Sequence, residues 1–65
     1  MKIIVNGAAF ETDTTTLASL LDDLGKGEAK VATSVNEDFV PKAMRASHVL
    51  QNGDRVEIVA PRQGG

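Results

Sequence analysis

The chain has 65 residues, no cysteine and a net charge of −2. This length allows one small domain, and the lack of cysteine excludes disulfides, thiolate metal sites and cysteine nucleophiles. The charge is spread without a basic stripe and only two residues are aromatic, which argues against nucleic-acid binding. No apolar run approaches the roughly 18 residues of a membrane span, and the first residues do not resemble a signal peptide. We therefore expect a soluble, cytoplasmic protein.

The first predicted element is a β-hairpin. Residues 1–6 alternate as a strand, and residues 8–12 return as a second strand. Between them, Asn6-Gly7 is the strongest short hairpin pattern, because both central residues of a type I′ turn need positive φ.

One amphipathic helix follows the hairpin. Leucines recur at the i, i+3, i+4 and i+7 spacing of a single helix face, namely Leu17, Leu20, Leu21 and Leu24. The threonines at residues 14–16 are candidate N-caps, and Gly25 suits the left-handed position that often ends a helix. We predict about three turns, whose apolar face needs a sheet to cover it.

The next segment predicts two short strands. Residues 30–35 alternate again, and residues 36–38 form a turn. Phe39-Val40 is a short extended piece, which Pro41 restricts to an edge or an end of the sheet.

The rest of the domain contains a loop and the last strand. We expect residues 42–50 to be a loop or a single helical turn, with Val49 and Leu50 entering the core. Residues 52–54 form a turn, and residues 55–60 alternate as the final strand.

This order of elements predicts an α+β fold. A mixed sheet on one helix buries every apolar stripe, and the first and last strands then pair in parallel through a right-handed crossover. That arrangement is the β-grasp, or ubiquitin-like, roll. We expect one domain over residues 1–60 and a tail over residues 61–65.

Searches for an active site in the sequence find little. His48 follows Ser47, but adjacent residues rarely align a nucleophile with its base, and no third group is there to orient them. Asp22-Asp23 lies off the leucine stripe and should face water. There is no Gly-rich phosphate loop, and one histidine without converging carboxylates does not make a metal site. The sequence therefore predicts no enzyme, no metal and no cofactor bound by this chain.

The tail carries the one chemical feature that stands out. After Pro61 the sequence ends in Gly64-Gly65, which places a carboxylate at the tip of an arm without side chains. Two glycines can enter a narrow channel in conformations closed to other residues. Such an end suits activation by a second enzyme. The alternative interpretation is an ordinary frayed terminus.

Three further segments stand beside Asn6-Gly7 and the leucine helix: 35–41 (VNEDFVP), 50–58 (LQNGDRVEI) and 61–65 (PRQGG). In the order and spacing of these motifs, the chain resembles the ThiS family of sulfur carrier proteins of thiamine biosynthesis. The Gly-Gly end alone is shared with ubiquitin and with the small subunit of molybdopterin synthase.

The resemblance implies a carrier cycle carried out by partner proteins. A ThiF-like enzyme would use ATP and magnesium to adenylate the carboxylate of Gly65. Sulfur from a donor such as a cysteine desulfurase would then give a thiocarboxylate, which a ThiG-like thiazole synthase would accept. Gly64 would be the side-chain-free approach to the acyl carbon.

Other functions remain open on the sequence. A molybdopterin-synthase small subunit, or a carrier for another sulfur-transfer route, would share the fold and the tail. A ubiquitin-like modifier would instead end with Gly65 in an isopeptide bond, and a plain interaction module would make no use of the tail.

Strand alternation predicts one further surface. If Ile3 and Val56 face the helix, then Ile4 and Val59 point to the opposite face of the sheet among charged residues. Apolar residues with a polar rim are typical of a small partner-docking face. Val59 lies six residues before Gly65, so a partner on this face could also receive the tail.

Overall fold

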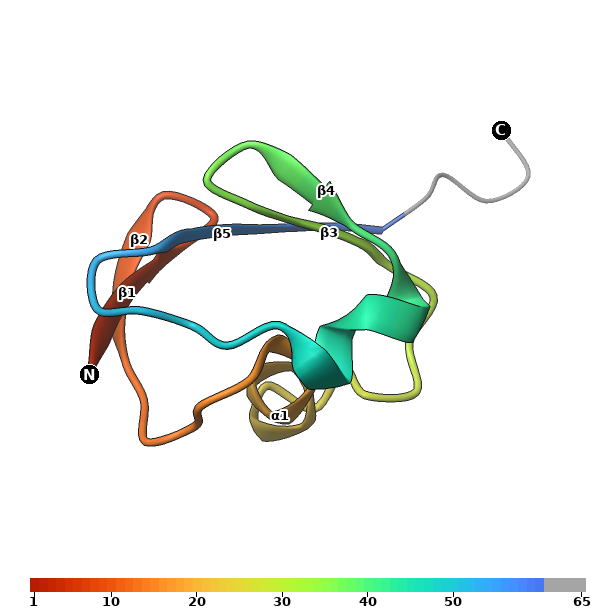
Figure 1. Ribbon diagram of the computed structural model, residues 1–65, viewed down its shortest axis with the longest axis horizontal. Helices are drawn as coiled ribbons and strands as arrows, with labels where there is room; N and C mark the ends of the chain where they lie inside the picture. Colours follow the sequence, from red (N-terminus) through yellow and green to blue (C-terminus); the bar gives the residue numbers. More distant parts are fainter. Residues whose placement is uncertain (61–65) are drawn as a thin grey trace.

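The computed structural model describes residues 1–60 as one sheet packed on a helix (Figure 1). In chain order the elements are β1 (Lys2–Val5), β2 (Ala8–Glu11), α1 (Leu17–Asp23), β3 (Ala32–Val35), β4 (Asp38–Val40), the 3-10 helix η1 (Lys42–Ser47) and β5 (Arg55–Val59). The sheet has its five strands in the order β2-β1-β5-β3-β4, and the helices α1 and η1 lie together on one side of it.

The strand pairing confirms the predicted β-grasp arrangement. β1 is antiparallel to β2 and parallel to β5, with Val5 opposite Val56. β3 pairs antiparallel with both β4 and β5. The first and last strands therefore occupy the interior of the sheet, as a buried parallel pair requires.

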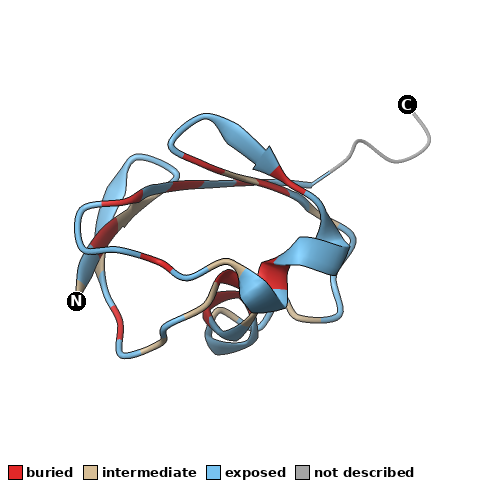
Figure 2. Ribbon diagram, viewed as in Figure 1, coloured by how far each residue is buried: buried red, intermediate tan, exposed pale blue. Residues whose placement is uncertain are grey.

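The core lies between the sheet and the helices, where the buried parts of the ribbon face one another (Figure 2). Leu17, Leu20 and Leu21 of α1 are almost completely buried, which confirms the leucine stripe. The other buried apolar residues come from the strands and the loop before β5: Ile3, Val35, Val40, Leu50, Val56 and Ile58.

The helix is shorter than predicted. Thr16 caps it by accepting a hydrogen bond from the Ser19 amide at 3.2 Å, and Leu24 ends it, so seven residues make about two turns rather than three. Gly25 follows with a φ of 75°, the left-handed conformation that we expected there.

The segment after Pro41 differs from the prediction. Lys42–Ser47 form a six-residue 3-10 helix rather than a loop or a single turn. Leu50 enters the core, but the prediction for Val49 was wrong, because its side chain is 58% exposed. Val49 bridges Thr16 in extended backbone, so it and Leu50 point to opposite sides. The final strand was expected to run to Ala60, with Ala60 on the face of Val56 and Ile58, but β5 ends at Val59 and Ala60 is exposed. Within residues 1–60, no helix is long and apolar enough to cross a membrane.

Candidate functional site

The candidate site begins where β5 leads into the tail. Gly64 and Gly65, the residues predicted to carry the chemistry, lie outside the described residues. What the structure does describe is the strand that leads to them. β5 lies in the interior of the sheet, between β1 and β3, so the chain leaves from the middle of the sheet (Figure 1).

An asparagine holds β5 on its β1 side beyond the regular strand pairing. The Asn6 amide donates to the Val56 carbonyl at 2.9 Å. Its side chain then continues the ladder: Oδ1 accepts from the Ile58 amide at 2.8 Å, and Nδ2 donates to the Ile58 carbonyl at 3.2 Å. Asn6 tolerates its φ of 49° because short polar side chains reach the left-handed region readily. The Asn-Gly turn thus also secures the last strand.

A second asparagine holds the other end of β5. Asn36 begins the turn between β3 and β4 with a φ of 52°. Its amide donates to the Arg55 carbonyl at 2.7 Å, and its Oδ1 accepts from the Arg55 amide at 3.0 Å. Its Nδ2 donates to the buried carboxylate of Asp54 at 2.9 Å.

Strand β3 completes the support of β5. Ala32 lies opposite Val59, the last residue of the strand. β5 is therefore hydrogen-bonded to β3 up to its end, and on its β1 side it is held by Asn6 as far as Ile58. We call this held end of β5, Ile58 and Val59, the fixed base of the tail.

Ile4 and Val59 both lie on the outer face of the sheet, as the pleat predicted. They lie at opposite ends of that face, because Ile4 pairs with Arg55, four residues before Val59 on β5. At about 3.3 Å per residue, roughly 13 Å separates the two positions along the strand. Val59 is 61% exposed, whereas Ile4 is half-buried.

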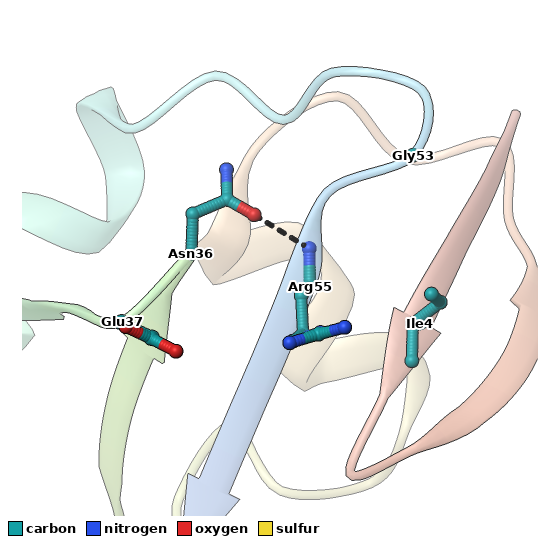
Figure 3. Close-up of a pocket in the computed structure, with 5 residues that line it drawn as sticks. All are labelled: Ile4, Asn36, Glu37, Gly53 and Arg55. Carbon is teal, nitrogen blue, oxygen red and sulfur yellow. Dashed lines mark hydrogen bonds between the residues drawn. The ribbon is translucent and has the colours of Figure 1, made fainter.

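Ile4 lines a shallow cavity of about 270 Å³ at the Arg55 end of the outer face, away from Val59 (Figure 3). Its other lining residues are Asn36, Glu37, Gly53 and Arg55. The side chains of Glu37, Arg55 and Ile4 come from a turn and two strands and lie in a row (Figure 3). Ile4 therefore sits beside the Arg55 cation, and the Glu37 carboxylate lies on the far side of Arg55, which is the charged setting expected around Ile4.

Sequence reasoning missed Phe39, the most exposed large apolar residue of this face. Its side chain is 69% exposed on β4, opposite Ser34 of β3. Ser34 in turn donates to Glu57 of β5 at 3.2 Å. The alternation of Phe39 with the buried Val40 contained this information. Through Ser34, Phe39 lies level with Glu57, midway along the face between the levels of Ile4 and Val59.

The polar residues weighed as an active site are not arranged as one. The Ser47 hydroxyl donates to the Met44 carbonyl at 3.1 Å, and His48 follows η1 as a half-buried residue. Asp22 and Asp23 are exposed on α1, as predicted. Within residues 1–60, no group of His, Asp and Glu side chains could hold a metal ion.

Comparison with known proteins identifies the family. The ThiS family model matches residues 3–65. The chain belongs to the ThiS family. The sulfur carrier protein ThiS of Escherichia coli K12 is 30% identical over 66 residues and is covered completely, as is this chain.

A second relative is much longer. The thiazole synthase of Paramagnetospirillum magneticum is 38% identical over 66 residues, and this chain spans only 20% of its length. A region resembling a ThiS-family chain is thus part of that synthase.

Solved structures agree with the family and the fold. The crystal structure of the thiamine biosynthesis protein ThiS from Geobacter metallireducens superposes with a TM-score of 0.86 at 25% identity, covering 100% of both chains. An NMR structure of a thiamine biosynthesis protein from the same organism gives 0.78 at 23% identity, covering 100% of this chain and 88% of that one. The second likeness supports the fold alone.

Proposed function

We propose that this chain is a sulfur carrier of thiamine biosynthesis that acts through the carboxylate of Gly65. The observation that carries the proposal is the ThiS family match, which extends to residue 65 and so includes the Gly-Gly end. The same match favours ThiS over the molybdopterin-synthase subunit and the protein modifier. In this proposal the chain is acted on by partner enzymes and is not an enzyme itself.

The proposed chemistry has three steps. The Gly65 carboxylate attacks the α-phosphorus of ATP and releases pyrophosphate, which leaves an acyl adenylate. The terminal sulfur of a persulfide, such as that of a cysteine desulfurase, then attacks the acyl carbon and displaces AMP. A thiol cleaves the resulting S–S bond, so that sulfur stays on Gly65 as a thiocarboxylate and the donor leaves in a disulfide.

This division of labour assigns ATP and magnesium to a ThiF-like partner. The thiocarboxylate would then donate its sulfur to a ThiG-like thiazole synthase. The longer relative supports that second partnership, because it is a thiazole synthase that contains a region like this chain. Gly64 contributes by leaving the approach to the acyl carbon free of side chains.

The test of the proposal is a one-residue extension. Adding Ala after Gly65 should abolish sulfur loading, because the acyl carbon would no longer be the terminal carboxylate. The wild-type chain, the extended chain and an Asp23→Asn control should be incubated with an activating enzyme, ATP and a sulfur source. Intact mass should show oxygen replaced by sulfur in the wild type and the control alone. Equal loading of the extended chain would contradict the proposal.

We also propose the outer face of the sheet as the docking surface for the activating enzyme. Ile4, Phe39 and Val59 are apolar on this face, although residues of the same strands that face α1 already supply the core. The fixed base of the tail lies at the Val59 end. A partner that receives the tail would therefore contact this face first at Val59.

Charge substitutions test this surface. Ile4→Glu and Val59→Glu should each weaken binding to the activating enzyme by about tenfold or more, because burying an unpaired carboxylate at an interface is costly. For Val59→Glu the effect on folding should be smaller than the effect on binding, since Val59 is 61% exposed. Calorimetric titration of the folded variants measures the affinity, with Asp23→Asn on α1 as the control. Unchanged affinity in both variants would assign these residues to ordinary surface.

A further inference from the structure

The proposed function leaves one feature unexplained, which is a buried arginine in the helix η1. Arg45 is 7% exposed, although arginine is almost never fully buried without a partner of opposite charge. Its Nε donates to the Thr33 hydroxyl at 3.0 Å, and its Nη2 donates to the Val31 carbonyl at 2.7 Å. Both acceptors are neutral. The one ion pair within residues 1–60 joins the Met1 ammonium to Glu11, so no carboxylate of that range pairs with Arg45.

Among the described residues, the third nitrogen of the guanidinium, Nη1, has no hydrogen-bond partner. In the same range, no fully buried side-chain nitrogen or oxygen lacks a hydrogen-bond partner. Nη1 is therefore not sealed from solvent. The two bonds that Arg45 does make fix the plane of the guanidinium, so the free nitrogen has a defined direction.

A cavity of about 150 Å³ lies beside this arginine, between α1 and η1. Its walls are largely small or apolar, and they come from both helices and the loop after α1: Ala18, Leu21, Asp22, Gly27, Lys42, Arg45 and Ala46. A Cβ at Gly27 would overlap Oδ1 of Asp22, so the Asp22 carboxylate lies directly over this glycine. The cavity has room for one short side chain.

The charges that line the cavity define the ligand it fits. Lys42 and Arg45 contribute two positive charges and Asp22 one negative charge, which leaves one positive charge unbalanced. A single carboxylate would neutralise it, whereas a phosphate dianion would leave an excess of negative charge. Guanidinium and carboxylate form strong, short hydrogen bonds. Ala18 and Leu21 suit the methylene groups that carry such a carboxylate.

The position of Arg45 connects the cavity to the base of the tail. Val31, whose carbonyl accepts from Nη2, precedes Ala32, and Ala32 pairs with Val59 at the end of β5. Arg45 is thus anchored one residue away from the strand position opposite Val59. A protein that grips the end of β5 would therefore lie within reach of the cavity.

We propose that the cavity between α1 and η1 binds an Asp or Glu side chain of the protein that receives the tail. Arg45 would hold the carboxylate through Nη1, and Lys42 would contribute from the rim. The identity of the partner rests on the proposed function, but the chemistry of the cavity does not.

Sodium propionate is a suitable probe, because it carries one carboxylate on a short apolar stem. The ¹⁵N-labelled chain should be titrated with propionate, with sodium chloride at equal concentration, and with inorganic phosphate. We expect a saturable shift of the Arg45 Nε resonance and of the Ala18 and Ala46 amides with propionate, with a midpoint on the order of 10 mM for so small a ligand. The absence of saturation, or tighter binding of phosphate than of propionate, would overturn the proposal.

Two variants locate the binding. Lys42→Gln should weaken propionate binding by about two- to fivefold, the effect expected of a partly exposed ion pair, and Lys2→Gln on β1 should leave it unchanged. Arg45→Lys should abolish the saturable propionate shift. A lysine ammonium lacks the planar, multi-nitrogen guanidinium that bonds Thr33 and Val31 and still leaves Nη1 for the carboxylate. If Arg45→Lys does not fold, Lys42→Gln still decides. Equal propionate affinity in Lys42→Gln and Lys2→Gln would overturn the site.

The source of the carboxylate is tested in the complex with the adenylating partner. Lys42→Gln should weaken that complex by about two- to fivefold relative to Lys2→Gln. A different outcome would be a complex with the partner that is equally strong for Lys42→Gln and Lys2→Gln while the wild-type chain still binds propionate as expected. That result would show that the cavity takes a free small carboxylate, and would overturn the assignment to a protein side chain. Sulfur loading of Gly65, read by mass, is a separate measurement, so a failure of this proposal is distinguishable from a failure of the carrier function.

Discussion

The two faces of the sheet are built from the same strands but differ in what covers them. On the inner face, Ile3 and Val56 are completely buried beneath α1. On the outer face, Phe39 and Val59 are 69% and 61% exposed, and no other element of residues 1–60 packs over them (Figures 1 and 2). The core accounts for the inner residues. The apolar residues of the outer face must be explained by contacts with other molecules or by chance.

The largest effect that would test this comparison comes from the helix that covers the inner face. Leu20→Ala should lower the free energy of unfolding by about 2–5 kcal/mol, because it leaves a cavity at a completely buried position. A loss of that size is a large part of the stability of so small a domain. Chemical denaturation measures it, with Val59→Ala as the outer-face control.

For Val59→Ala we expect a change within about 0.5 kcal/mol, as for most exposed positions. Similar midpoints for the two variants would remove the energetic distinction between the faces.

A smaller effect should follow from releasing β5 from the Asn6 side chain. Asn6→Gly keeps the backbone conformation accessible but leaves the Ile58 amide and carbonyl without their partners, which should cost about 1–3 kcal/mol. Amide exchange at Ile58 should accelerate with the loss of stability. Asn6→Asp retains the acceptor and should fall between Asn6→Gly and the wild type. If Asn6→Gly were as stable as the wild type, β1 and β3 alone would suffice to hold the strand.

A gain of stability, smaller than the losses in Leu20→Ala and Asn6→Gly, is expected at the rim of the outer face. Glu37 adopts a φ of 73° in the turn after β3, where a side chain is strained and glycine is not. Glu37→Gly should raise the free energy of unfolding by up to about 1 kcal/mol, the strain relieved less the added chain entropy. Thermal unfolding of the two proteins in parallel measures the difference. A clear loss of stability would mean that the Glu37 side chain contributes more than its backbone costs.

The fold could be predicted because its elements are strongly patterned. The leucine spacing identified α1, and Asn6-Gly7 identified the first hairpin. Period-two alternation assigned Ile3 and Val56 to the core and Ile4 and Val59 to the other face, and the structure confirms all four placements. The docking role of Ile4 and Val59 stays a prediction.

The remainder depends on contacts that a local pattern does not encode. Residues 42–47 have no clear period, so the 3-10 helix that brings Arg45 beneath β3 could not be foreseen. The same contact makes Arg45 a buried residue, although the residue type favours the surface. The second role of Asn6, which holds Ile58 from 52 positions away, likewise appears only when the chain is folded.

The parallel pairing of β1 with β5 has a consequence for synthesis on the ribosome. The strand that completes the middle of the sheet is the last of the five to be made, and its partner is the first. Until Val56 has emerged, β1 has β2 as its only partner, and a lone hairpin is at best marginally stable in water. The nascent chain therefore cannot acquire its native structure stepwise, and its apolar residues stay accessible to chaperones and proteases until β5 is available.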